Sequence, residues 1–170
     1  MGRYAVLLCA QDSEFVKKKY GGYFGVFLRL LREEGETWDK FKVCGGEFPN
    51  DDEIELYDGF VITGSASGAH GNALWIIKLR NLLKKLDAYL KKRLLGICFG
   101  QLIFFDCALG DKTGGAGSGW DVGVIDINLS KSTSLLCDSL KIPTTLSLIE
   151  FHRDVVYSLN IFFFNFDTIN

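Results

Sequence analysis

Short apolar runs alternate with amphipathic stretches along the first part of the chain. The run from Arg3 to Ala10 is of the kind that is buried on both faces of a parallel sheet. Residues 23–35 (YFGVFLRLLREEG) carry large apolar side chains at helical spacing, and we expect Gly35 to end this helix as its C-cap. Residues 37–43 (TWDKFKV) alternate as a second strand would, and residues 57–65 (YDGFVITGS) have the apolar core and glycine-rich exit of a third.

From Asn72 the pattern becomes helical. One stripe of this helix collects large apolar side chains, namely Trp75, Leu79, Leu82, Leu83, Leu86 and Leu90. A strand from Leu94 to Ile97 follows, and then a helix from about Gln101 to Leu109. Because strands and helices alternate several times, the sequence predicts an α/β fold with a parallel sheet flanked by helices.

After Gly110 the character of the chain changes. Residues 110–123 (GDKTGGAGSGWDVG) predict a loop, whereas residues 122–130 (VGVIDINLS) and 146–154 (LSLIEFHRD) resemble strands of an antiparallel excursion. The last residues, 157–170 (YSLNIFFFNFDTIN), show neither a period nor capping residues. We therefore expect one domain over residues 3–156 and leave the tail, 157–170, unassigned.

The composition argues against several classes of protein but does not identify the function. The 170 residues are 48% hydrophobic with a formal net charge of -2, which lacks the basic excess needed to bind nucleic acid. The five cysteines are odd in number and never spaced C-x-x-C, so they indicate neither a disulfide framework nor a zinc site. No apolar run approaches the roughly 20 residues of a membrane span. We expect a cytoplasmic protein with no metal or cofactor; its oligomeric state stays open.

One cysteine stands out by its place in the pattern. Cys98 follows the strand ending at Ile97 and lies in the frame Gly96-Ile97-Cys98-Phe99-Gly100, which matches the strained strand-to-helix elbow G-x-S-x-G with sulfur in place of oxygen. Such a turn holds the sulfur at a helix N-terminus, where the dipole favours the thiolate, and the backbone N–H of Phe99 can donate to an oxyanion. These are the requirements of acyl transfer to a thiol.

Other features of the sequence have less specific interpretations. The remaining cysteines, Cys9, Cys44, Cys107 and Cys137, are expected to be small buried apolar residues. A second glycine-rich strand exit, TGSASG at residues 63–68, would lie at the same edge of the sheet, so Gly64 could supply a further oxyanion N–H. On spacing alone, residues 63–68 fit a plain loop without a functional role equally well. His70 is expected to be a solvated loop residue or a group at the substrate rim.

Several blocks of the chain resemble one family in order, from about Arg3 to Val156. The class I glutamine amidotransferases, and among them the plant gamma-glutamyl peptidases, are similar to the segments DSEFVKKKYGGY, EGETWDKF, GEFP, YDGFVITGS, LGICFGQ, GWDVG and EFHRD. The resemblance implies a flavodoxin-like fold and a small-molecule gamma-glutamyl substrate, glutathione conjugates being the implied class. It further implies that Cys98 is the nucleophile and that Gly64 and Phe99 form the oxyanion hole.

The chain departs from that family at two places. Family members read G-I-C-F-G-H-Q at the elbow, whereas here Gln101 follows Gly100 directly, which displaces the substrate-holding glutamine by one position. The general base and its orienting acid belong to a later Q-G-H-P-E segment, and nothing after His152 matches it. The resemblance therefore predicts that the C-terminal elements of the fold are missing and that the catalytic histidine is absent.

His152 is one alternative to the missing general base, with Asp154 as the carboxylate that would orient its imidazole, as in a catalytic triad. The resemblance, however, places this segment apart from the triad, so we assign His152, with Gln101, to substrate binding. Two functions then stay open. The first is a thiol hydrolase or amidotransferase acting on gamma-glutamyl amide or peptide bonds, impaired by the missing segment; the second is a non-catalytic relic that serves as a binding or regulatory module.

Overall fold

The computed structural model describes residues 2–88, 90, 92–109, 113–115, 119, 121–128, 143–152 and 154–156. The chain falls into two compact units, one built on the residues up to Gly114 and the other on Gly115–Val155. The first unit contains the parallel sheet and Cys98, and the second contains the antiparallel strands.

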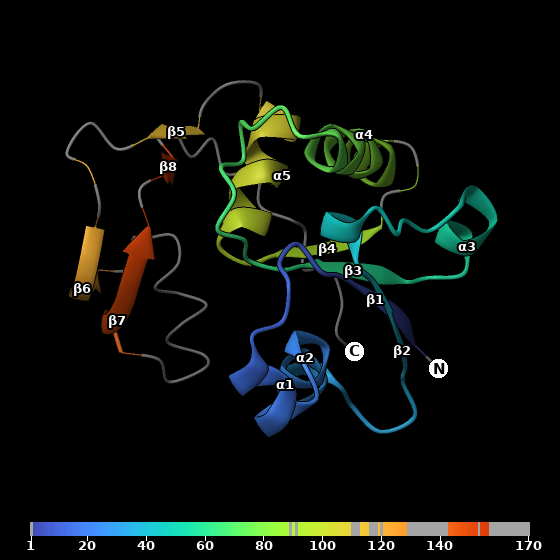
Figure 1. Ribbon diagram of the computed structural model, residues 1–170, viewed down its shortest axis with the longest axis horizontal. Helices are drawn as coiled ribbons and strands as arrows, with labels where there is room; N and C mark the ends of the chain where they lie inside the picture. The colour runs from blue at the N-terminus through green and yellow to red at the C-terminus, as the bar shows by residue number, and fades with distance from the viewer. Residues whose placement is uncertain are drawn as a thin grey trace. The chain divides into compact units, whose positions relative to one another are not determined.

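Four parallel strands form the sheet of the first unit. They are β1 (Arg3–Leu7), β2 (Thr37–Phe41), β3 (Gly59–Ile62) and β4 (Arg93–Gly96), in the order β2-β1-β3-β4 (Figure 1). The register pairs Leu7 with both Phe41 and Ile62, and pairs Ile62 with Gly96, so the carboxyl ends of the strands lie at one edge. The predicted parallel α/β fold is confirmed.

Helices cover both faces of this sheet. The helices α4 (Leu74–Ala88) and α5 (Phe99–Leu109) lie on one side, while α1 (Glu14–Tyr20) and α2 (Tyr23–Leu31) lie on the other (Figure 1). A short helix α3 (Asp51–Glu55) and a 3₁₀ turn (Val43–Gly45) occupy the connections. The sequence pattern did not predict α1 or α3, because both are short and depend on caps: Ser13 caps α1 through the N–H of Val16.

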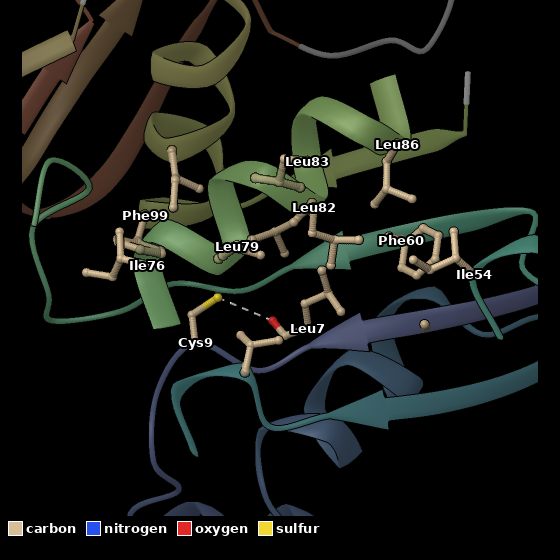
Figure 2. Close-up of a cluster of buried hydrophobic side chains, with 14 of the residues drawn as sticks. Leu7, Cys9, Ile54, Phe60, Ile76, Leu79, Leu82, Leu83, Leu86 and Phe99 are labelled. Carbon is tan, nitrogen blue, oxygen red and sulfur yellow. Dashed lines mark hydrogen bonds between the residues drawn. The ribbon is translucent and has the colours of Figure 1, made fainter. Parts of the chain in front are cut away.

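The larger core lies between the sheet and α4 with α5. Figure 2 shows the leucines of α4 directed toward Phe60 of β3 and Leu7 of β1. The predicted apolar stripe is confirmed, since Leu79, Leu82, Leu83 and Leu86 are buried and Trp75 and Leu90 pack at its border. A smaller cluster of Val6, Leu8, Phe27 and Val61 lies on the α2 side.

The expected end of the helix predicted over residues 23–35 was wrong. Helix α2 ends at Leu31, Arg32 has already left the helical conformation as its C-cap, and Gly35 with φ +83° belongs to the turn before β2. The carboxylate of Glu36 accepts the N–H of Glu33 at 2.9 Å and the indole N–H of Trp38 at 2.9 Å, which ties this turn to the strand. That arrangement depends on side chains, so the apolar period could not reveal it.

The second unit is built on an antiparallel pair. The strands β6 (Asp121–Asn128) and β7 (Thr145–His152) pair from Asp121 opposite His152 to Asn128 opposite Thr145, which confirms the predicted antiparallel excursion. Where a continuous loop was expected, β5 (Thr113–Gly115) forms a short strand that pairs with β8 (Asp154–Val156). The pairing joins residues far apart in sequence and has no local signature. The tail 157–170 lies outside the described residues.

Candidate active site: a cysteine at a strand-to-helix elbow

Cys98 occupies the junction between β4, which ends at Gly96, and α5, which begins at Phe99. Its φ is +55°, and no other non-glycine residue that the structure describes has a positive φ. A left-handed backbone conformation costs an L-residue roughly 1–2 kcal/mol, so the surrounding structure must hold Cys98 in place. The thiol is exposed to solvent. A strained backbone that presents a nucleophilic side chain at the carboxyl edge of a parallel sheet is the geometry of a nucleophile elbow.

The glycines on each side of Cys98 are required by close backbone packing. A Cβ at Gly100 would lie 2.2 Å from the carbonyl oxygen of Ile62, and a Cβ at Gly96 would lie 2.6 Å from the carbonyl oxygen of Gly100. Both distances are far inside van der Waals contact. The predicted G-x-C-x-G frame therefore has a steric cause, namely that the first turn of α5 packs directly on the end of β3.

The N-terminal turn of α5 is fixed by backbone hydrogen bonds around Cys98. The carbonyl of Cys98 accepts the N–H groups of Gln101 at 3.0 Å and Leu102 at 3.1 Å, and the carbonyl of Ile97 accepts the N–H of Gly100 at 3.0 Å. None of these bonds uses the N–H of Phe99. The ring of Phe99 is buried, 5.7 Å from the ring of Trp75 centroid to centroid, so it anchors the turn in the core.

The second predicted glycine lies beside the elbow. An ideal Cβ at Gly64 would be 3.6 Å from the Cβ of Cys98, and Ile97 donates its N–H to the carbonyl of Ile62 at 3.0 Å. The exits of β3 and β4 therefore meet, and the structure brings together Cys98, Phe99 and Gly64.

Thr63, which precedes Gly64, was not singled out by the sequence pattern. It is buried, its hydroxyl accepts the N–H of Cys9 at 2.9 Å, and the same hydroxyl donates to the carbonyl of Gly64 at 3.3 Å. A threonine at the end of an apolar run is a common strand residue, so no local signal distinguishes it.

The remaining candidate residues are Gln101, His70 and His152. Gln101 lies in the first turn of α5 and is exposed, as is His70 in the loop after β3. His152 is the last residue of β7 in the second unit, and its side chain lies outside the described residues, as does that of Asp154. Its role in substrate binding therefore stays a prediction.

The remaining cysteines contrast with Cys98. Cys9 is buried, and desolvation raises the pKa of its thiol to about 12. Cys44 is half-buried, and the pKa of its thiol is raised, again mainly by desolvation. The side chains of Cys107 and Cys137 lie outside the described residues. Where the chain is described, only the thiol of Cys98 combines exposure with the elbow position.

A cleft of about 470 Å³ lies at the other end of the sheet. Its lining includes Tyr4, Gly59 and Arg93, which are at or near the starts of β1, β3 and β4, and it opens beside Trp38 on the α2 face. Cys98 follows the carboxyl end of β4, so this cleft is not part of the elbow. Within the described ranges, no group of three or more His, Cys, Asp or Glu side chains is arranged to hold a metal ion, and no helix is long and apolar enough to cross a membrane.

Comparison with known proteins finds relatives by sequence and, separately, neighbours by fold. The chain is 45% identical over 160 residues to gamma-glutamyl peptidase 3 of Arabidopsis thaliana, covering 92% of this chain and 64% of that protein. It is 46% identical over 155 residues to gamma-glutamyl peptidase 2 of the same plant, covering 91% of this chain and 61% of the relative. The chain is a homologue of the gamma-glutamyl peptidases. It spans somewhat less than two thirds of their length.

Solved structures agree at the level of the fold. The crystal structure of a glutamine amidotransferase from Thermotoga maritima matches with a TM-score of 0.68 at 18% identity, covering 91% of this chain and 61% of that one. A glutamine amidotransferase from Methylobacillus flagellatus matches with a TM-score of 0.65 at 18% identity, covering 90% of this chain and 55% of that one. No protein-family model matches the chain. The resemblance and the glutamine amidotransferase fold predicted from the sequence are confirmed.

Proposed function

We propose that this protein is a thiol-dependent hydrolase or amidotransferase that acts on gamma-glutamyl amide or peptide bonds, with Cys98 as the nucleophile. The observation that carries the proposal is the positive φ of Cys98 at an exposed strand-to-helix turn, because strain of this kind is retained where it serves a purpose. The relatives named gamma-glutamyl peptidase support the gamma-glutamyl carbonyl as the substrate group.

The reaction would begin when the Cys98 thiolate attacks the gamma-carbonyl carbon and forms a C–S bond. The carbonyl oxygen becomes an oxyanion, for which the N–H groups of Gly64 and Phe99 are the proposed donors. Collapse of this intermediate breaks the bond to the leaving amine and leaves a gamma-glutamyl thioester on Cys98, which water then hydrolyses. The first step needs no base once the thiolate has formed.

Departure of an amine is the step for which no proton donor has been assigned among the residues that the structure describes. An amine leaves only when a proton is delivered to its nitrogen, and positioned general acid catalysis typically contributes about 10²–10⁴-fold. No Q-G-H-P-E segment occurs in the sequence. We therefore propose that acylation of Cys98 is retained and that turnover of amides and peptides is slow, glutathione conjugates included.

The test compares leaving groups on one acyl group. The protein is incubated with an activated gamma-glutamyl ester and with gamma-glutamyl-alanine, and intact-mass spectrometry follows acylation while amine release is measured in parallel. We expect the ester to acylate wild-type protein and not Cys98→Ala, with peptide hydrolysis close to background. Acylation that persists in Cys98→Ala would refute the assignment of the nucleophile.

Two further outcomes distinguish the remaining hypotheses. Rapid peptide hydrolysis that His152→Ala abolishes would show that His152 is the base and that the proposed impairment is wrong. Saturable binding of gamma-glutamyl-alanine without acylation by the ester would favour the alternative function, a non-catalytic binding module.

A further inference from the structure

We propose that Thr63 is a positioning residue that releases the N–H of Gly64 from the sheet and makes it available to the oxyanion. The proposal rests on the function proposed above, and it concerns hydrogen bonding at the ends of β1, β3 and β4. Its starting observation is that Thr63 is buried, with 4% of its surface exposed, at the point where β3 ends.

The hydroxyl of Thr63 takes the place of a backbone carbonyl in the sheet. Leu7 pairs with Ile62, and the carbonyl of Leu7 accepts the N–H of Thr63 at 3.2 Å, as a parallel ladder requires. The next bond of a regular ladder would join the N–H of Cys9 to the carbonyl of Thr63. Instead, Cys9 donates to the side-chain oxygen of Thr63 at 2.9 Å.

This substitution frees the peptide that joins Thr63 to Gly64. In a regular parallel sheet this peptide would direct its carbonyl to β1 and its N–H to β4, where the carbonyl of Ile97 would accept it. The preceding bond of that ladder is present, because Ile97 donates to the carbonyl of Ile62 at 3.0 Å. Among the backbone hydrogen bonds of the described residues, none joins the N–H of Gly64 to the carbonyl of Ile97.

The same hydroxyl also fixes the following residue. It donates to the carbonyl of Gly64 at 3.3 Å, so both sides of Gly64 are set by the Thr63 side chain. Gly64 itself lies against Cys98, with 3.6 Å between its ideal Cβ position and the Cβ of Cys98. One buried hydroxyl therefore satisfies the N–H of Cys9, ends the β1–β3 ladder and orients the loop beside the nucleophile.

Removal of the hydroxyl with the side-chain volume nearly preserved has a specific expected effect. In Thr63→Val the N–H of Cys9 loses its acceptor. A buried donor without a partner is unfavourable, so we expect this N–H to donate instead to the backbone carbonyl of residue 63. That rotation turns the N–H of Gly64 away from the substrate and toward the carbonyl of Ile97, which it would share with the N–H of Gly100. Loss of one oxyanion donor typically lowers kcat by about 10²–10³-fold.

The experiment separates this role from a general disturbance of the elbow. Iodoacetamide alkylates Cys98 with loss of iodide and forms no oxyanion, whereas an activated gamma-glutamyl ester forms a tetrahedral oxyanion at the same sulfur. Wild-type protein, Thr63→Val and Thr63→Ser are compared with both reagents. We expect Thr63→Val to lower the acylation rate by about 10²–10³-fold while the alkylation rate changes little, and Thr63→Ser to restore most of the acylation rate.

Equal losses in both reactions, or no loss in acylation, would overturn the proposal. A second measurement keeps it testable if the ester does not acylate wild-type protein, an outcome that counts against the proposed function alone. Amide hydrogen exchange of Gly64 should be fast in wild-type protein and in Thr63→Ser, and slowed in Thr63→Val. An unchanged Gly64 exchange rate in Thr63→Val would show that the hydroxyl does not control this peptide.

Discussion

The packing of Gly100 against β3 leads to a quantitative prediction for Gly100→Ala. The new Cβ would lie 2.2 Å from the carbonyl oxygen of Ile62 and 2.8 Å from its carbonyl carbon. Even a tight contact requires the two segments to separate by about 1 Å. The obstacle is backbone, so no side-chain rotation can relieve it.

The rest of the core opposes that separation. Ile62 of β3 and Ile103 of α5 are fully buried, and Phe99 is 1% exposed, so the strand and the helix are both anchored. Overpacking in such a site costs roughly 1–3 kcal/mol, and a backbone obstacle places Gly100→Ala near the upper end. Alanine favours a helix over glycine by about 0.5–1 kcal/mol, and this offsets part of the overpacking cost. We expect a net loss of about 2 kcal/mol in the free energy of unfolding.

Urea unfolding followed by tryptophan fluorescence measures this change, and an unchanged m-value would show that the denatured state is unaffected. Gly68→Ala is the matched control, because nothing lies within 4 Å of its ideal Cβ and its expected change is within about 0.5 kcal/mol. If Gly100→Ala proves as stable as Gly68→Ala, the elbow is not packed on β3 as described.

Three further predictions concern the cysteines. Cys98→Gly should raise the free energy of unfolding by about 0.5–1 kcal/mol in thermal or urea unfolding, because glycine accepts a φ of +55° without strain; Cys98→Ala, which keeps the Cβ, should show no such gain. Iodoacetamide at neutral pH should label Cys98 before Cys9 and Cys44 by peptide mapping, since only its thiol is exposed; simultaneous labelling of all three would contradict the fold around them. Stability should fall between about pH 9 and pH 12, because the pKa of Cys9 rises from 9.0 to about 12 on folding and only the unfolded thiol ionises in that window. The part of this loss that comes from Cys9 is on the order of 4 kcal/mol. The fall with pH should therefore be shallower in Cys9→Ala, where the remainder comes from Tyr57, whose pKa is also raised to about 12 in the folded protein.

The sequence alone determined those features that depend on near neighbours. The alternation of apolar runs with amphipathic stretches predicted the parallel sheet, and the leucine stripe from Leu79 to Leu86 predicted the buried face of α4. The spacing of Gly96 and Gly100 around Cys98 predicted the elbow, because only glycine fits where a strand turns at once into a helix. In each case the side chains that specify the feature lie within a few residues of one another.

Only the tertiary structure decided the features that join distant segments. The pairing of β5 with β8 and the end of α2 at Leu31 have no local pattern. The hydrogen bond from Cys9 to the Thr63 hydroxyl spans 54 residues, and the approach of Gly64 to Cys98 spans 34. A hydrophobic period records which face of an element is buried, whereas a single hydrogen bond between two strand ends leaves no period in the sequence. The placement of the elbow's partners therefore depends on the register of the folded sheet, which is fixed only when β1, β3 and β4 pack against α4 and α5.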